Sequence, residues 1–483
     1  MKKKRIVKII IFLCMLSISY LFVRNALSFK YGDGILGLHT FYDLEDNTVD
    51  VLILGSSHAF EDFNTGVLYE DYGVASYVLA GSVQPLWNTY YYLTEALKTQ
   101  SPSLVILEGY GTSIINDYSD NSRIIKNTFG IRNPIVRFQS IEVSAPPNTR
   151  DDYIYAYRLW HSRYTEYGIQ DTKAYYDKPF FTDRKGFGQN LEQKKYDIPD
   201  IDYTYNNATE LSEKTELYYR MIIELCKNRN IPLVILVSPY ILNQEDHNRF
   251  CKASEIAAEY DIPFGDFNDP WLYNALNLDF SSDFADAGHL NNYGNEKFTR
   301  FIAENLLKEY NLPDRRNNPR YESWKMNALD LKLRRSDDEL VKSDDIDLFV
   351  KQTVSRDGLT IFILPISDFE KLGGCLEEYF EGQLNTDIRS GGLYIYKEHV
   401  LSQIKDGINW DYSYDICHKQ LYISSNMIVS SGKSSEEIII DCGGHNYANS
   451  LDGIYLIVVD DTTQELVCVR QLTTDEEGEI VLR

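Results

Sequence analysis

Short apolar runs that alternate with helical patterns limit the fold of the first two-thirds of the chain more than any other feature. The runs are rich in Val, Ile and Leu and cover 49–54, 75–79, 104–107 and 233–237. Such runs are typical of strands that are buried on both faces of a parallel sheet. Patterns of helical period lie between and after them, over 84–98, 210–227, 246–260 and 292–310. This alternation predicts a three-layer α/β domain over about 45–312.

The stretch 111–202 interrupts the alternation, because it is polar, dense in tyrosine and free of sheet-like runs. We interpret it as an insertion, and insertions beside the carboxyl ends of parallel strands commonly shape a substrate cleft. A helix is predicted around 153–163, where Trp160, His161 and Arg163 are candidates for substrate binding. The alternative is that this helix only packs against the sheet.

The last third of the chain has a different character. Residues 313–336 are charged and predict a loop-like linker. Beyond 337, β-branched or alternating runs are separated by glycine pairs, which predicts a β-sandwich-like accessory domain over 337–483. A chain of 483 residues is also too long for one ordinary core, so two domains are expected.

The N-terminus indicates the compartment. Four basic residues at positions 2–5 precede an apolar segment over 6–23, in which Lys8 can extend its ammonium group toward the membrane surface. We expect residues 1–28 to form an uncleaved single-pass anchor in the cell membrane, with the basic end cytoplasmic and the remainder extracytoplasmic. A cleaved signal peptide is the alternative.

Charge and cysteine content exclude some classes of partner. The formal net charge of −24 argues against nucleic acid, which requires clustered Lys and Arg. The seven cysteines show neither CxxC nor finger-like spacing, so we expect no metal site and no cofactor.

Two short segments carry the chemistry. Gly55-Ser56-Ser57-His58 follows the first apolar run, which places a serine at the carboxyl end of a parallel strand and the amino end of a helix. That position favours a developing alkoxide or oxyanion, although a helix-capping serine has the same pattern.

The second segment, Asp286-Ala-Gly-His289-Leu-Asn, lies 232 residues after Ser57. The spacing lets the carboxylate meet Nδ1 of the imidazole while Nε2 faces a nucleophile. The alternative is a surface Asp that caps the next helix. Together the segments predict a serine hydrolase or acyltransferase with Ser57 as nucleophile, His289 as base and Asp286 as its orienting group.

These two blocks resemble the first and last blocks of the SGNH/GDSL hydrolase superfamily, over about 45–312. The resemblance implies a flavodoxin-like fold and an oxyanion hole formed by the backbone N–H of Ser57 and by Gly81. The family's third block normally supplies an asparagine, where this chain has Glu108-Gly109-Tyr110, so a full three-donor oxyanion hole is in doubt. Similar departures occur in the membrane-anchored branch that includes the teichoic-acid D-alanine transfer protein and alginate O-acetylation proteins. Those proteins act beside membrane-bound O-acyltransferases.

The tail from Gly453 to Val467 is similar to the end of interleukin-like EMT-inducer domains. Taken together, these features lead us to expect a membrane-anchored extracytoplasmic acyltransferase or esterase that acts on O-acyl, in particular acetyl, groups of a cell-surface polysaccharide. A membrane-bound O-acyltransferase is the expected protein partner. The alternatives are a secreted carbohydrate or lipid esterase, and a non-catalytic glycan-binding assembly protein on an SGNH scaffold.

Overall fold

The computed structural model describes most of the chain. The described residues are 2–29, 32–156, 159, 163–165, 168, 184–204, 207–367, 372–377, 379–380, 392–407, 409–416, 419–430, 433–448, 450–475 and 477–483. They form two compact units, Met1–Leu331 and Lys332–Arg483.

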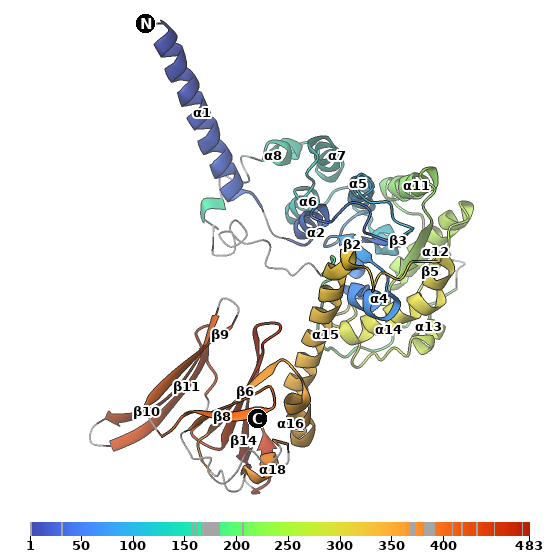
Figure 1. Cartoon of the computed structure of the whole chain (residues 1–483). Helices are drawn as coiled ribbons and strands as arrows, with labels where there is room; N and C mark the ends of the chain where they lie inside the picture. Colours follow the sequence, from blue (N-terminus) through green and yellow to red (C-terminus); the bar gives the residue numbers. More distant parts are fainter. Residues whose placement is uncertain are drawn as a thin grey trace. The chain divides into compact units, whose positions relative to one another are not determined.

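A parallel sheet of five strands organises the first unit (Figure 1). Its strands are β1 (Val51–Gly55), β2 (Ser76–Ala80), β3 (Leu104–Glu108), β4 (Leu233–Val237) and β5 (Phe264–Asp266). Their order, β2-β1-β3-β4-β5, is that of flavodoxin-like doubly wound sheets. The apolar runs predicted β1 to β4, which is confirmed. The sequence did not reveal β5, because it has only three residues and only Asp266 is buried in it.

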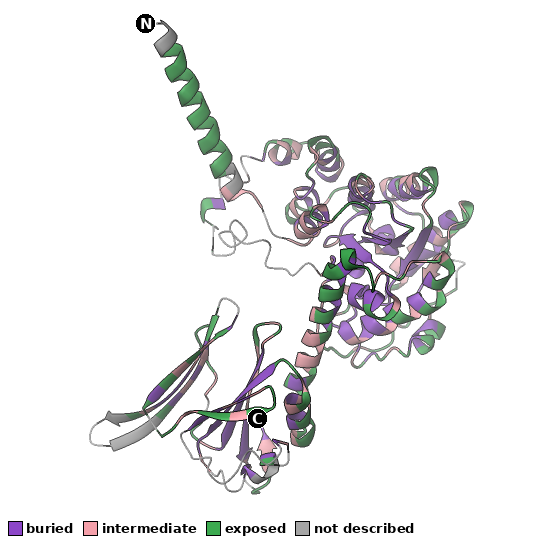
Figure 2. Ribbon diagram, viewed as in Figure 1, coloured by how far each residue is buried: buried purple, intermediate pink, exposed green. Residues whose placement is uncertain are grey.

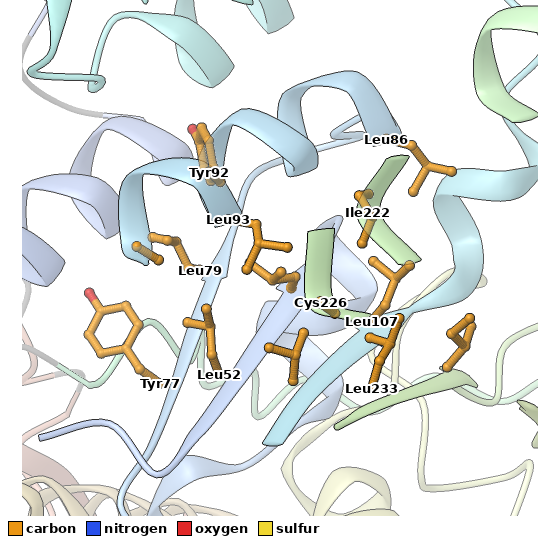
Figure 3. Close-up of a cluster of buried hydrophobic side chains, with 14 of the residues drawn as sticks. Leu52, Tyr77, Leu79, Leu86, Tyr92, Leu93, Leu107, Ile222, Cys226 and Leu233 are labelled. Carbon is orange, nitrogen blue, oxygen red and sulfur yellow. The ribbon is translucent and has the colours of Figure 1, made fainter. Parts of the chain in front are cut away.

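Each face of this sheet packs against its own hydrophobic core. Leu52 and Leu54 point into one core and Val51 and Ile53 into the other, so both faces are buried, as the unbroken apolar runs predicted. The first core is covered by α2 (Asp33–Tyr42), α5 (Leu86–Ala96), α11 (Glu213–Asn228) and α12 (Gln244–Glu259). The second is covered by α3 (Ser57–Asp62), α4 (Thr65–Tyr72), α13 (Pro270–Ala275) and α14 (Asn292–Asn305). Figure 3 shows the first core, where Leu93, Leu107 and Ile222 pack between sheet and helices.

Between β3 and β4, the expected insertion is largely helical over its described residues up to Thr165 and has no helix over 184–202. It contains η1 (Gly109–Ser113), α6 (Asn121–Thr128), α7 (Pro134–Ser144), α8 (Arg150–Tyr155) and η2 (Arg163–Thr165). Asn133 caps α7 through its side chain, and Pro134 occupies the first turn, where a missing N–H costs nothing. These helices bury a small core of their own around Ile124, Ile141 and Tyr153.

The N-terminal helix α1 (Lys2–Leu27) is exposed along its described side chains (Figure 2). Its segment Arg5–Val23 has 19 residues and a mean hydropathy of 2.5, which is long and apolar enough to cross a membrane. A signal sequence has the same length and composition.

The region expected to be a loop-like linker, 313–336, is largely helical instead. After η4 (Leu307–Tyr310) and η5 (Pro319–Tyr321), helix α15 (Glu322–Lys342) begins. Trp324 in its first turn is buried and donates its indole N–H to the carbonyl of Ser76 at 2.9 Å. The charged residues of α15 masked this contact in the sequence, since a few buried aromatic residues are enough to hold a polar helix on a core.

The second unit contains two antiparallel sheets with a shared core. One sheet has the order β15-β14-β13-β6-β7-β8 and the other β12-β11-β10-β9. The strands are β6 (Leu359–Pro365), β7 (Leu393–Lys397), β8 (Val400–Lys405), β9 (Trp410–Ile416), β10 (Lys419–Ser430), β11 (Lys433–Cys442), β12 (His445–Asn446), β13 (Ile454–Asp460), β14 (Glu465–Thr474) and β15 (Ile480–Leu482). Phe362 and Tyr455 of the first sheet meet Leu421 and Ile440 of the second. The other face of the larger sheet is covered by helices, α16 (Ile346–Ser355) and α18 (Gly374–Glu377), which the sequence did not indicate.

Candidate active site

Ser57, His289 and Asp286 form one continuous chain of hydrogen bonds. The Ser57 hydroxyl lies 2.8 Å from Nε2 of His289, and Nδ1 of His289 lies 2.8 Å from Oδ1 of Asp286. An ionised carboxylate only accepts hydrogen bonds, so Nδ1–H donates to Asp286 and Nε2 is left to accept the serine proton. This arrangement can activate a hydroxyl as a nucleophile.

The serine is positioned by a sharp change of direction after β1. Gly55 pairs with Ala80 of β2, and α3 begins two residues later at Ser57. A Cβ at position 55 would lie 2.7 Å from Cβ of Glu108 and 3.0 Å from Cβ of Ala59, and the backbone φ there is +157°. Only glycine lets β1, β3 and the start of α3 approach so closely.

The histidine loop is held by its own backbone. The N–H of Gly288 donates to Oδ1 of Asp286 at 2.7 Å, and the N–H of Ala285 donates to the carbonyl of His289 at 3.0 Å. Asn291 then caps α14 by accepting from the N–H groups of Tyr293 and Gly294. The cap of α14 is therefore Asn291 and not Asp286, whose Oδ1 lies 2.8 Å from Nδ1 of His289.

His58, next to Ser57, is buried among aromatic rings. Its ring stacks on Tyr110 with a centroid distance of 4.2 Å and meets Tyr240 edge-on at 4.9 Å. The His289 ring lies 5.0 Å away. Burial, and to a lesser extent the neighbouring His289, lower the pKa of His58 well below its usual value, so it is neutral at physiological pH.

Asp62, at the end of α3, is a buried carboxyl group that joins the two halves of the site. It accepts a hydrogen bond from the Ser238 hydroxyl and one from the backbone N–H of Leu290 at 2.9 Å. Burial raises the pKa of Asp62 well above its usual value, and the two hydrogen bonds oppose that shift. The sequence did not single out Asp62, because an acidic residue at the end of a short helix carries no distinctive pattern.

Glu108 occupies the position where the family resemblance leads one to expect an asparagine. It is fully buried at the end of β3, beneath Gly55, and accepts the backbone N–H of Tyr110 at 2.8 Å and the hydroxyl proton of Ser56 at 3.4 Å. Burial raises the pKa of Glu108 to about 8, although its hydrogen bonds act in the other direction. Glu108 therefore supports the strand ends below Ser57.

Gly81, the expected second oxyanion donor, follows directly after β2. Because Ala80 pairs with Gly55, Gly81 lies at the same edge of the sheet as the serine turn. The buried side chain of Asn127, from α6, lies against it: a Cβ on Gly81 would come within 2.1 Å of Oδ1 of Asn127. Asn127 also donates to the carbonyl of Ser82 at 3.3 Å, so the insertion holds this loop. No sequence pattern predicted this contact, because it joins residues far apart in the chain.

Of the three predicted substrate-binding residues, the structure describes only Arg163. Trp160 and His161 lie outside the described residues. Arg163 is buried, with 4% of its surface exposed, and donates to the carbonyls of Leu27 and Ser28 at 3.0 and 2.9 Å. Its guanidinium also covers the ring of Phe29 at 4.5 Å. Arg163 thus binds the chain that leaves α1, and its part in substrate binding stays a prediction.

Comparisons with known proteins add little to this picture. No protein-family model matches the chain, and no curated protein matches its sequence. Among solved structures, the chain is similar to a crystal structure of a Bacteroides fragilis NCTC 9343 protein whose name assigns it provisionally to the acylhydrolases. The two share 12% identity with a TM-score of 0.27, over 56% of this chain and 94% of that chain. A likeness at this level says nothing about activity, which must be judged from the site itself.

Proposed function

We propose that the first unit is a serine acyltransferase or esterase of the SGNH type that works through an acyl-Ser57 intermediate. The observation that carries this proposal is the hydrogen-bond chain from Ser57 through His289 to Asp286. The flavodoxin-like strand order and the glycine-dependent serine turn support it.

In the first half-reaction, Ser57 Oγ attacks the carbonyl carbon of an ester while its proton passes to Nε2 of His289. The bond from the acyl carbon to the leaving oxygen breaks, and His289 returns the proton to that oxygen. Asp286 stabilises the imidazolium. The N–H of Ser57 and Gly81 are the proposed donors to the developing oxyanion.

In the second half-reaction, a sugar hydroxyl or water gives its proton to His289 and attacks the acyl carbon. The bond to Ser57 Oγ breaks, and Oγ takes the proton back. Transfer and hydrolysis share every step except the identity of the acceptor. We propose O-acetyl groups of a cell-surface polysaccharide as the substrate, with α1 as a single-pass membrane anchor, the enzyme outside the cytoplasm and a membrane-bound O-acyltransferase as partner.

The test is labelling of the full-length protein with a fluorophosphonate probe, followed by mapping of the adduct. We expect the label on Ser57 and none in the Ser57→Ala variant. Ser56→Ala is the matched control, since Ser56 is buried and faces Glu108. A label on Ser56, or a label that survives Ser57→Ala, would show that the proposal is wrong. No labelling of a folded protein would favour a non-catalytic scaffold.

A further inference from the structure

A cavity of about 640 Å³ lies beside the candidate catalytic residues. It is bounded by the loop after β2, by η1 and the start of the insertion, and by the first turns of α12. The lining residues that matter most are Val83, Tyr110, Tyr118, Arg123, Asp246 and Arg249.

Tyr110 connects this cavity to the nucleophile. Tyr110 lines the cavity, and its ring stacks on that of His58, the residue after Ser57, with a centroid distance of 4.2 Å. Val83 makes a second connection, because it lines the cavity and follows Gly81 by two residues. Neither Ser57 nor His289 is among the lining residues, so a sugar unit in the cavity would lie beside the reacting serine and not on it.

The backbone at Val83 is in an unusual conformation. Its φ is +44°, a left-handed value that a β-branched residue rarely adopts. The turn is closed by the N–H of Gln84, which donates to the carbonyl of Gly81 at 3.1 Å. Strain of this kind persists where a particular backbone shape serves a site. Here it lies between the proposed oxyanion donor and the cavity.

The lining suits hydroxyl groups better than an ion. It contains two carboxylates, Asp120 and Asp246, and two guanidinium groups, Arg123 and Arg249, so positive and negative charges are balanced. Arg249 has 11% of its side chain exposed, and its terminal nitrogens donate to Asp246 and Glu245 at 3.4 Å. The Arg249–Asp246 pair therefore borders the cavity with a donor and an acceptor side by side. Tyr118, held under Lys214 Nζ at 4.8 Å, offers a ring face.

We propose that this cavity is an acceptor subsite that binds one sugar unit of a polysaccharide while a neighbouring unit presents its hydroxyl to acyl-Ser57. Sugar hydroxyls both donate and accept, so they can satisfy carboxylates and guanidinium groups together, and a sugar face can cover a tyrosine ring. The inference rests on the proposed function and specifies its acceptor: an oligosaccharide is a better acceptor than a single sugar.

The experiment uses the full chain in detergent with p-nitrophenyl acetate as donor. The acceptors are the tetrasaccharide of N-acetylglucosamine and maltotetraose. Each is compared with its own monosaccharide, N-acetylglucosamine or glucose, under the same conditions. Mass spectrometry measures the amount of acetylated sugar, and the transfer ratio is this amount divided by the amount of acetate released by hydrolysis. We expect at least one tetrasaccharide to exceed its monosaccharide about tenfold, as one or two charged hydrogen bonds would allow.

Arg123→Ala should lower the tetrasaccharide ratio about tenfold, toward the monosaccharide value. Arg316→Ala is the matched control: the two side chains are 45% and 44% exposed and each pairs with a nearby aspartate, but Arg316 does not line the cavity. Binding of the tetrasaccharide to the Ser57→Ala protein, observed by saturation-transfer NMR, should be lost when Arg123→Ala is added. Melting curves show that the variants are folded.

Equal ratios for tetrasaccharide and monosaccharide with both sugars would overturn the acceptor subsite. So would equal ratios in Arg123→Ala and Arg316→Ala. Failure of the proposed function looks different: the wild-type protein would then show no p-nitrophenyl acetate hydrolysis that Ser57→Ala abolishes.

Discussion

Asp62 accepts the backbone N–H of Leu290 at 2.9 Å, and this bond ties the residue after His289 to the helix that begins with Ser57. Ser57 and His289, the proposed nucleophile and base, are 232 residues apart in the chain. We infer that their position within hydrogen-bonding distance depends in part on this buried carboxyl group, which holds the backbone beside His289 and makes no hydrogen bond with its ring among the described contacts.

Two replacements of Asp62 should show whether the activity depends on the shape of the side chain or on its charge. Asp62→Asn keeps a side-chain oxygen that can accept the N–H of Leu290, so it should keep most of the activity. Asp62→Ala removes the acceptor for Leu290 and should lower kcat about 10- to 100-fold with little change in KM. Steady-state kinetics on p-nitrophenyl acetate measure both. Full activity in Asp62→Ala would contradict a positioning role.

The orienting role of Asp286 can be tested by Asp286→Asn. The amide can present N–H toward Nδ1, which favours the wrong tautomer of His289, so kcat should fall about 10⁴-fold. His289→Ala should cost about as much, and the double variant should cost little more, because the residues act as a unit. Additive losses in the double variant would indicate that the two residues act independently.

Two glycines of the site should respond differently to alanine. Gly55→Ala places a methyl group 2.7 Å from Cβ of Glu108 and should destabilise the first unit by roughly 1–3 kcal/mol, with loss of activity. At Gly288 the nearest atom to a new Cβ is Oδ1 of Asp286 at 3.4 Å, an ordinary contact. Gly288→Ala should therefore fold normally. Thermal melting and fluorophosphonate labelling compare the two, and equal stability would show that Gly55 is not required.

Glu108 predicts a pH dependence of stability. Its pKa is about 8 in the folded protein, above the ordinary value of 4.5, so the folded state binds the proton more tightly than the unfolded chain. Stability should fall as pH rises between these values, by up to roughly 1.4 kcal/mol per pH unit.

Glu108→Gln keeps the shape of the side chain but cannot ionise, so the stability of the variant should not show this fall with pH. The melting temperature of the variant minus that of the wild type should therefore increase from pH 5 to pH 8. Melting curves at several pH values give this difference. A constant difference would mean that Glu108 is ionised in the folded protein at all these pH values.

Arg163→Ala should loosen the chain between α1 and α2 without affecting the triad. The variant loses two hydrogen bonds to carbonyls and the contact with Phe29. Hydrogen exchange of residues 27–29 in the full-length protein should become faster than in Arg150→Ala, whose arginine pairs with Glu142 inside the insertion. Equal exchange in both variants would show that Arg163 does not hold this segment.

How much could be predicted from sequence depended on whether a residue's partner is local or distant. The runs at β1 to β4 and the spacing of Asp286 and His289 depend on neighbours within a few residues, so their patterns are visible in the chain. Asp62 and Asn127 act through partners 228 and 45 residues away, at Leu290 and Ser82, and no short pattern records such a contact. The hydrophobic periodicity of 322–342 also does not distinguish α15 from a linker, because the helix is fixed to the core through the buried Trp324.

Only five residues lie between Leu27, the last residue of α1, and Asp33, whose carboxylate accepts a hydrogen bond from Ser82 beside Gly81. The six Cα-to-Cα steps from Leu27 to Asp33 span no more than about 22 Å in a fully extended chain. If α1 crosses a membrane, this short connection keeps the loop around Gly81, and with it Ser57, close to the lipid surface. A substrate of the proposed acyl-Ser57 chemistry would then have to come to that surface, and a polymer far from the membrane would be out of reach.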